Sequence, residues 1–153
     1  MNWESGEGLL GIDDPAEWDA AYERGERRLG TAVIGLAFNC SLEEASPRIV
    51  RAMKLPDAAE RGFAYTAAGV AARRHGELTP ELYASLRAAG PGRRSIAVNA
   101  VDDVLDHVPF NRLPLWLKGW MVVSTVRNRL EVWRMNAGET VGWVRRALRR
   151  RRS

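Results

Sequence analysis

The stretch DAAERGFAYTAAGVAARRHGELTPEL (residues 57–82) decides the fold class of this chain. Asp57 is a suitable N-cap residue, and an acid follows it three residues later. Apolar side chains then recur on one helical face, at Ala59, Phe63, Ala67, Val70 and Ala71. Gly76 is expected to end this helix, and Thr79, which a proline follows, begins the next one. The stretch therefore predicts two helices joined by a short turn.

Similar signals occur on the N-terminal side of this stretch. Residues 1–12 are rich in glycine and show little periodicity, which indicates a loose arm. Asp14 followed by Pro15 marks a helix start. The apolar run 31–38 fits either a buried strand or a buried helix by periodicity, and we favour the helix because no second strand is available to pair with it.

The start of the next helix has two candidates. Ser41 and Glu44 have the spacing of a capping box, but a helix that began there would contain Pro47, at a cost of about 3 kcal/mol. Ser46 as the cap, with Pro47 in the first helical position, avoids this cost. The sequence therefore favours a helix that starts at Pro47.

Helical periodicity continues on the C-terminal side. A helix over about residues 94–107 is expected to bury one stripe of side chains, namely Ile96, Ala100, Val101, Val104 and Leu105. A long amphipathic helix is expected from Pro114 to about Met135, and a short one over about residues 139–150. Together these segments predict an all-α fold, a compact HEAT-like array of antiparallel helix pairs with six or seven helices. The expected organisation is an arm (1–12), a single helical domain (13–144) and a basic tail (145–153).

Three segments resemble those of bacterial HEAT-like helical-repeat proteins over about residues 30–108. Residues 63–78 end in Ala72-Arg73-Arg74-His75-Gly76-Glu77-Leu78, which is similar to the Ala-Arg-x-His-Gly-x-Leu turn of that group. Residues 99–105 resemble the ending of its second repeat, and residues 35–38 its preceding helix. The resemblance implies a binding scaffold of the immunity or accessory type, which acts on a bacterial toxin, and it implies no catalytic residue.

Charge is unevenly distributed along the chain. The formal net charge is +4, but six arginines lie in the last nine residues, and the remainder has 17 basic residues against 19 acidic ones. Abundant alanine and arginine favour a bacterial source. A single cysteine fits a reducing compartment, and no signal peptide is recognisable at the N-terminus, so we expect a cytoplasmic protein.

The sequence offers one set of partner-binding candidates. Asp102, Asp103 and Asp106 would lie on one flank of their helix, either as a solvated face or as a contact surface for a basic protein. The turn formed by Arg73, Arg74 and His75 is the second part of this set, although basic residues before a terminal glycine also interact favourably with the helix dipole. A preformed helical face would then cover the working surface of the partner.

An alternative surface lies near the C-terminus. Trp116 and Trp120 are one turn apart, and fit the core of the terminal helices, a hot spot for a protein partner, or a membrane interface. The run that contains Arg149, Arg150 and Arg151 fits a nucleic-acid contact, an anionic-membrane contact or a solvated terminus. Binding of nucleic acid or an anionic membrane through these residues is the alternative function.

Catalytic and metal sites are not expected. The two histidines, His75 and His107, are far apart in the sequence. Asp103 and His107 have the i, i+4 spacing of a ligand pair on one helix, but a single pair makes a poor metal site. Cys40 ends an apolar run and is interpreted as a small core residue rather than a nucleophile. An enzymatic role such as a HEAT-like glycosylase is disfavoured because no basic groove with a catalytic acid can be assembled. No cofactor and no small-molecule substrate are expected.

Overall fold

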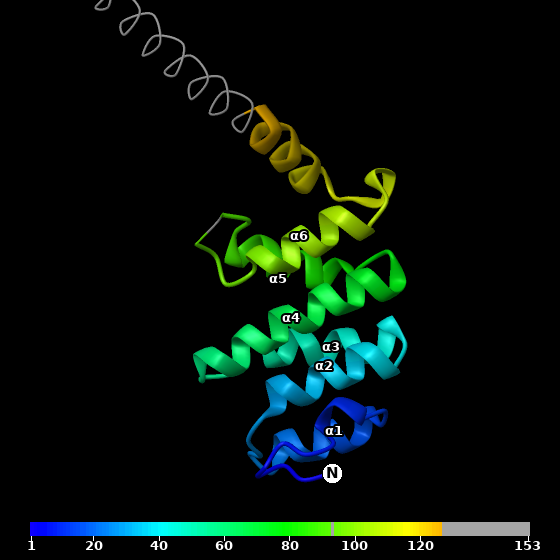
Figure 1. The fold of residues 1–153 in the computed structure, drawn as a ribbon, viewed down its shortest axis with the longest axis vertical. Helices are drawn as coiled ribbons and strands as arrows, with labels where there is room; N and C mark the ends of the chain where they lie inside the picture. Colours follow the sequence, from blue (N-terminus) through cyan, green and yellow to red (C-terminus); the bar gives the residue numbers. More distant parts are fainter. Residues whose placement is uncertain (93, 127–153) are drawn as a thin grey trace, which may run out of the picture. The chain divides into compact units, whose positions relative to one another are not determined.

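The computed structural model describes residues 1–92 and 94–126, and every regular element in these ranges is helical (Figure 1). The chain forms two compact units, Met1–Pro114 and a second that starts at Leu115. The first unit contains six α-helices and two short 3-10 helices. Their bounds are η1 Leu9–Gly11, α1 Pro15–Glu23, α2 Leu29–Asn39, α3 Leu42–Ala52, α4 Ala58–His75, α5 Pro80–Ala89, α6 Val98–His107 and η2 Phe110–Arg112. The predicted all-α fold is confirmed.

The helices of the first unit form two layers. α2, α4 and α6 follow one another in one layer, where α2 packs on α4 and α4 packs on α6 (Figure 1). α3 contacts both α1 and α5 in the other layer, and contacts between α3 and both α2 and α4 join the two layers. Helices of the α2–α4–α6 layer run in the same direction, because the first turns of α2 and α4 adjoin each other, as do the last turns of α4 and α6.

Small residues let the helices of this layer approach closely. α4 buries mainly alanines on its inner face, and a Cβ atom added at Gly30 of α2 would lie 2.9 Å from the Cα of Glu60 on α4. Gly35 plays the same role against η1, where an added Cβ would lie 2.5 Å from the carbonyl oxygen of Leu9. Glycine therefore sets the spacing between α2 and α4 at position 30, and between α2 and η1 at position 35.

Most predicted helix ends are confirmed. Asp14, Asp57 and Thr79 each cap their helix by accepting a hydrogen bond from a backbone N–H group of its first turn. Gly76 ends α4 with a φ angle of 64°, a left-handed conformation that glycine adopts without steric cost. Local sequence chemistry therefore specifies where these helices begin and end.

The predicted start of the third helix was wrong. α3 begins at Leu42, behind a complete capping box in which Ser41 and Glu44 satisfy each other's backbone N–H groups. Pro47 lies inside the helix with its ring exposed, while Ala45, Ser46 and Ile49 face the core. The loss of one hydrogen bond at Pro47 is outweighed by the two caps and by this buried face.

Three further expectations were wrong. Residues 1–12 are not a loose arm, because Leu9 and Ile12 are buried and η1 packs on α2. α6 begins at Val98 rather than near residue 94, so Ile96 lies in the preceding turn and is 45% exposed. On α4, Phe63 is also exposed, because the buried face of that helix is centred on its alanines.

Residues 115–126 are helical, as expected for the segment after Pro114. The rest of that predicted helix, the short helix over 139–150, the expected domain boundary at residue 144 and the basic tail lie outside the described residues. In the described part of the chain, no helix combines the length and the apolar character needed to cross a bilayer.

Candidate functional site

The two parts of the predicted partner surface meet where α4 packs on α6. The Nε atom of Arg73, in the last turn of α4, lies 3.7 Å from a carboxylate oxygen of Asp103 on α6. Asp103 packs directly over Gly69, where an added Cβ would lie 3.2 Å from the carboxylate carbon. The structure therefore joins Arg73 and Asp103 to each other within the protein. Because both side chains are partly solvated, the pair stabilises the fold by at most about 1 kcal/mol.

The other two carboxylates of the cluster have a different environment. Asp102 and Asp106 are exposed, one turn apart on α6, and neither forms an ion pair with any residue of the described ranges. The backbone beneath them is fixed, because Ala100, Val101 and Val104 anchor the opposite face of α6 in the core. Asp102 and Asp106 therefore form a rigid, negatively charged edge, which we call the α6 carboxylate edge.

The basic turn at the end of α4 does not act as one group. Arg74 is exposed, whereas the Nε2 atom of His75 is buried and has no hydrogen-bond partner among the described residues. His107 ends α6 and donates from Nδ1 to the carbonyl oxygen of Asp103 at 2.9 Å. Of the three residues in this turn, Arg74 is therefore the one that is exposed and forms no ion pair within the described residues.

The residues of the alternative surface are described only in part. Trp116 and Trp120 are both half-buried on the helix over 115–126. The arginine run with Arg149, Arg150 and Arg151 lies outside the described residues.

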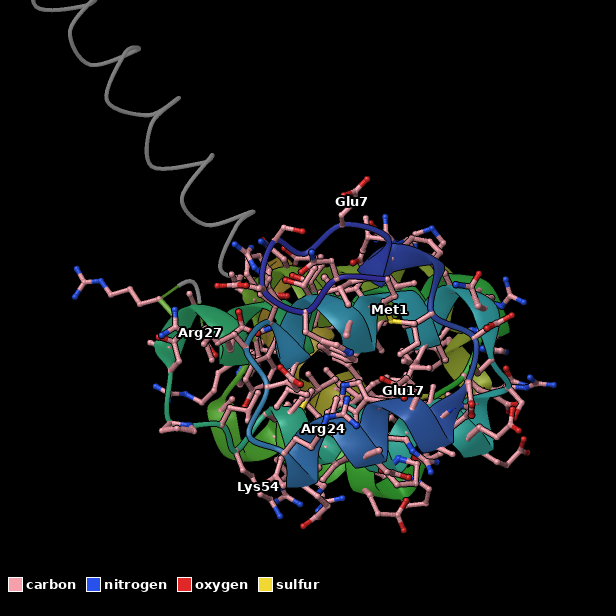
Figure 2. The ribbon with its side chains drawn as sticks, turned by 90° about the horizontal axis from the view of Figure 1, so that it is seen from below. Met1, Glu7, Glu17, Arg24, Arg27 and Lys54 are labelled. Carbon is pink, nitrogen blue, oxygen red and sulfur yellow. The ribbon has the colours of Figure 1, made fainter. Side chains whose placement is uncertain are left out.

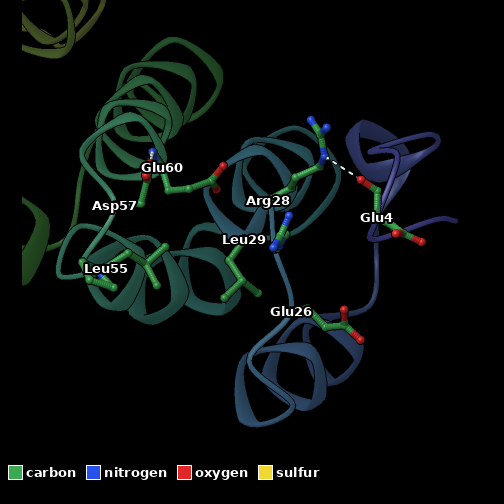
Figure 3. Close-up of a pocket in the computed structure, with 9 residues that line it drawn as sticks. Glu4, Glu26, Arg28, Leu29, Leu55, Asp57 and Glu60 are labelled. Carbon is green, nitrogen blue, oxygen red and sulfur yellow. Dashed lines mark hydrogen bonds between the residues drawn. The ribbon is translucent and has the colours of Figure 1, made fainter.

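Sequence reasoning missed a pocket of about 480 Å³ between the start of α2 and the start of α4 (Figure 3). Its charged lining consists of four acids and two arginines, Glu4, Glu26, Asp57, Glu60, Arg27 and Arg28, and its apolar lining is Leu29, Leu55 and Pro56. No local sequence pattern marks this pocket, since it forms only when two helix starts thirty residues apart adjoin each other.

Arg28 shapes one wall of the pocket. It has a φ angle of 63°, and among the residues that the structure describes it is the one non-glycine residue with positive φ. Its Nε atom donates to the carbonyl oxygen of Glu4 at 3.1 Å, which holds the N-terminal segment against the start of α2 (Figure 3). A single left-handed residue of this kind costs about 1–2 kcal/mol.

Most charges around this end of the unit are already engaged. Glu26 pairs with Arg24 at 3.2 Å, and Arg24 also pairs with Glu17 at 3.2 Å on the adjoining surface (Figure 2). Glu60 binds the backbone N–H group of Gly30 at 2.6 Å, and Asp57 caps its own helix. Because the carboxylates and guanidinium groups of the lining largely serve the fold, the pocket favours no single class of ligand.

Neither a reactive thiol nor a metal site is found in the described residues. Cys40 is buried, and its Sγ atom donates to the carbonyl oxygen of Asp13 at 3.4 Å. Burial raises the pKa of this thiol, and the carboxylates of Glu44 and Asp13 raise it further, so the thiolate is disfavoured. Over residues 1–92 and 94–126, no three histidine, cysteine, aspartate or glutamate side chains are grouped to hold a metal ion.

The geometry of the first unit defines an all-α, two-layered helical array with a charged edge on its last helix. No family model, curated protein or solved structure matches this chain.

Proposed function

We propose that the protein is a non-catalytic binding scaffold that docks a basic segment of a partner protein on the α6 carboxylate edge. One observation carries this proposal. Of three neighbouring carboxylates on α6, Asp103 is paired with Arg73, whereas Asp102 and Asp106 are exposed and make no ion pair within the described residues. Charges held in this way on a rigid surface attract and orient a partner of opposite charge.

The rigidity of α6 supports the same function. Because Ala100, Val101 and Val104 are buried, docking on the outer face of α6 requires little ordering of the scaffold. Arg74, in the last turn of the neighbouring helix α4, is also exposed, and it offers a positive charge to a partner surface that carries both signs of charge. The specific form we propose is an immunity or accessory protein of the HEAT-like type, which occludes the working surface of a toxin in the bacterial cytoplasm.

The proposal is tested by charge removal at the edge. The tagged full-length protein is used to isolate a protein that binds it stoichiometrically at moderate salt, and the Kd of that protein is then measured for variants. D102N/D106N is expected to weaken binding about tenfold, because two exposed ion pairs contribute up to about 1 kcal/mol each.

The matched control is E43Q/E81Q, which removes two exposed carboxylates from the first turns of α3 and α5. It changes the net charge by the same amount and leaves α6 untouched, so its Kd should equal that of the unmodified protein. Equal weakening by both variants would show that only the overall charge matters, and would overturn the assignment of the α6 carboxylate edge.

A further inference from the structure

The segment that follows Pro114 has an exposed apolar surface. Its described part, residues 115–126, is helical and contains one charged residue, Lys118. Leu115 is 84% exposed, Val122 is 60% exposed and Val126 is 53% exposed. Their spacing of seven and four residues places the three side chains on one side of the helix. We call these three residues the aliphatic stripe.

The rest of this helix is mainly apolar, and its polar side chains are Lys118, Ser124 and Thr125. Leu117 is buried, and Trp120 and Met121 are half-buried. A helix of this kind is stable in water only when other apolar material covers it. An exposed aliphatic stripe on such a helix is typical of an interaction surface.

The distribution of charge along the chain indicates which kind of partner can cover the aliphatic stripe. Residues 115–153 contain ten basic and two acidic residues, a net charge of +8, whereas residues 1–114 contain 13 basic and 17 acidic residues, a net charge of −4. A second copy of the same segment would bring +8 against +8, which disfavours self-association through the stripe. Nucleic acid would neutralise the charge but would leave the aliphatic side chains without an apolar environment.

A membrane surface with anionic lipids meets both requirements. Its headgroups attract arginine, with each basic residue near the surface adding to binding, and its acyl region accepts leucine and valine. Tryptophan is typical of the boundary between the two regions, and Trp116 and Trp120 occupy the same helix as the stripe. We propose that the helix over residues 115–126 docks the protein on the surface of an anionic phospholipid bilayer through the aliphatic stripe, and the net charge of +8 over residues 115–153 favours an anionic surface.

The test is cosedimentation of the full-length protein with vesicles. Vesicles of phosphatidylglycerol and phosphatidylcholine in equal amounts are compared with phosphatidylcholine vesicles at about 0.1 M salt, where surface charges still interact. Binding to the mixed vesicles is expected to be at least about tenfold stronger. The triple variant L115A/V122A/V126A retains the charge and the helical propensity, and it is expected to bind the mixed vesicles at least about tenfold more weakly.

A matched control removes three exposed apolar side chains from the first unit. L10A/F38A/I96A alters residues that are 56%, 46% and 45% exposed, and it should bind the mixed vesicles as the unmodified protein does. Three results would overturn the proposal: vesicle binding unaffected by the stripe variant, equal loss in the control, or capture of a DNA duplex without any binding to mixed vesicles.

Discussion

The carboxylate of Glu60, in the first turn of α4, accepts a hydrogen bond of 2.6 Å from the backbone N–H group of Gly30, in the first turn of α2. α2 has no side-chain cap of its own, because the residue before it, Arg28, has no hydrogen-bond acceptor in its side chain. Glu60 therefore caps a helix thirty residues earlier in the chain and fixes α2 against α4. Glu60 also lines the pocket at that end of the unit.

G30A tests whether the close approach of the α2 and α4 backbones at Gly30 and Glu60 determines the spacing of these helices. An added Cβ would lie 2.8 Å from the carbonyl carbon and 2.9 Å from the Cα of Glu60, and a backbone cannot move aside as a side-chain end can. We expect a loss of about 3 kcal/mol in the free energy of unfolding, measured by urea denaturation.

The matched control for G30A is G62A on α4. Gly62 has nothing within 4 Å of an added Cβ, so alanine there should stabilise the helix by about 1 kcal/mol. A small effect of G30A, or a loss at both glycines, would contradict the close approach of α2 and α4.

The sequence predicts those features of the fold that depend on contacts between residues close together in the chain. Asp14, Asp57 and Thr79 cap helices through contacts within three residues, so local chemistry was sufficient to place those helix starts. Glu44 and Glu60 each lie three residues after the residue that caps their helix. Glu44 binds the backbone N–H group of its own cap residue, whereas Glu60 binds that of Gly30 on another helix. No short-range sequence pattern distinguishes the local contact from the distant one.

Pro47 shows a second limit of local reasoning. Its presence inside a helix costs free energy, but the burial of Ala45, Ile49 and Ala52, together with the complete capping box, determines where α3 begins. Local rules alone do not include the free energy of that tertiary face. The candidate site shows the same limit: the acidic cluster was visible in the sequence, but the pairing that separates Asp103 from Asp102 and Asp106 depends on how α4 packs on α6.

G69A tests the contact between α4 and α6. The added Cβ would overlap the Oδ2 atom of Asp103, which would then have to turn away from Arg73. We expect a loss of about 1 kcal/mol, smaller than for G30A because a side-chain end can move. In a D103A background, G69A should lower the free energy of unfolding much less. An equal loss in both backgrounds, measured by urea denaturation, would disprove the contact.

The capping box of α3 makes stability depend on pH. S41A should lower the free energy of unfolding by about 1 kcal/mol at neutral pH, because the cap is lost. The hydrogen bonds from the side chain and the backbone N–H of Ser41 lower the pKa of Glu44 below its ordinary value of 4.5. Its contribution is therefore present above that pH and is lost as the pH falls through the lowered pKa.

E44Q checks this dependence by urea denaturation over a pH series. The variant should be less stable than the unmodified protein at neutral pH, and the difference should disappear in acid. A difference that stays constant from neutral pH into acid would contradict a role for the ionised carboxylate.

Cys40 is expected to be protected from alkylation. Burial raises the pKa of its thiol, so little thiolate is present. Because the side chain is buried, the reagent reaches it only after local opening of the structure. Native protein should react with iodoacetamide at least about a hundredfold more slowly than urea-unfolded protein. Comparable rates in the two states would mean that Cys40 is not part of the core.

We propose that the helical body, rather than the basic tail, binds the partner. A pull-down from the native cell lysate at moderate salt tests this, with the full-length protein and with a chain that lacks residues 145–153. Both forms are expected to capture one protein in equal, stoichiometric amounts, and D102N/D106N is expected to capture less of it. Capture that requires residues 145–153, or that yields nucleic acid in place of a protein, would contradict the proposal.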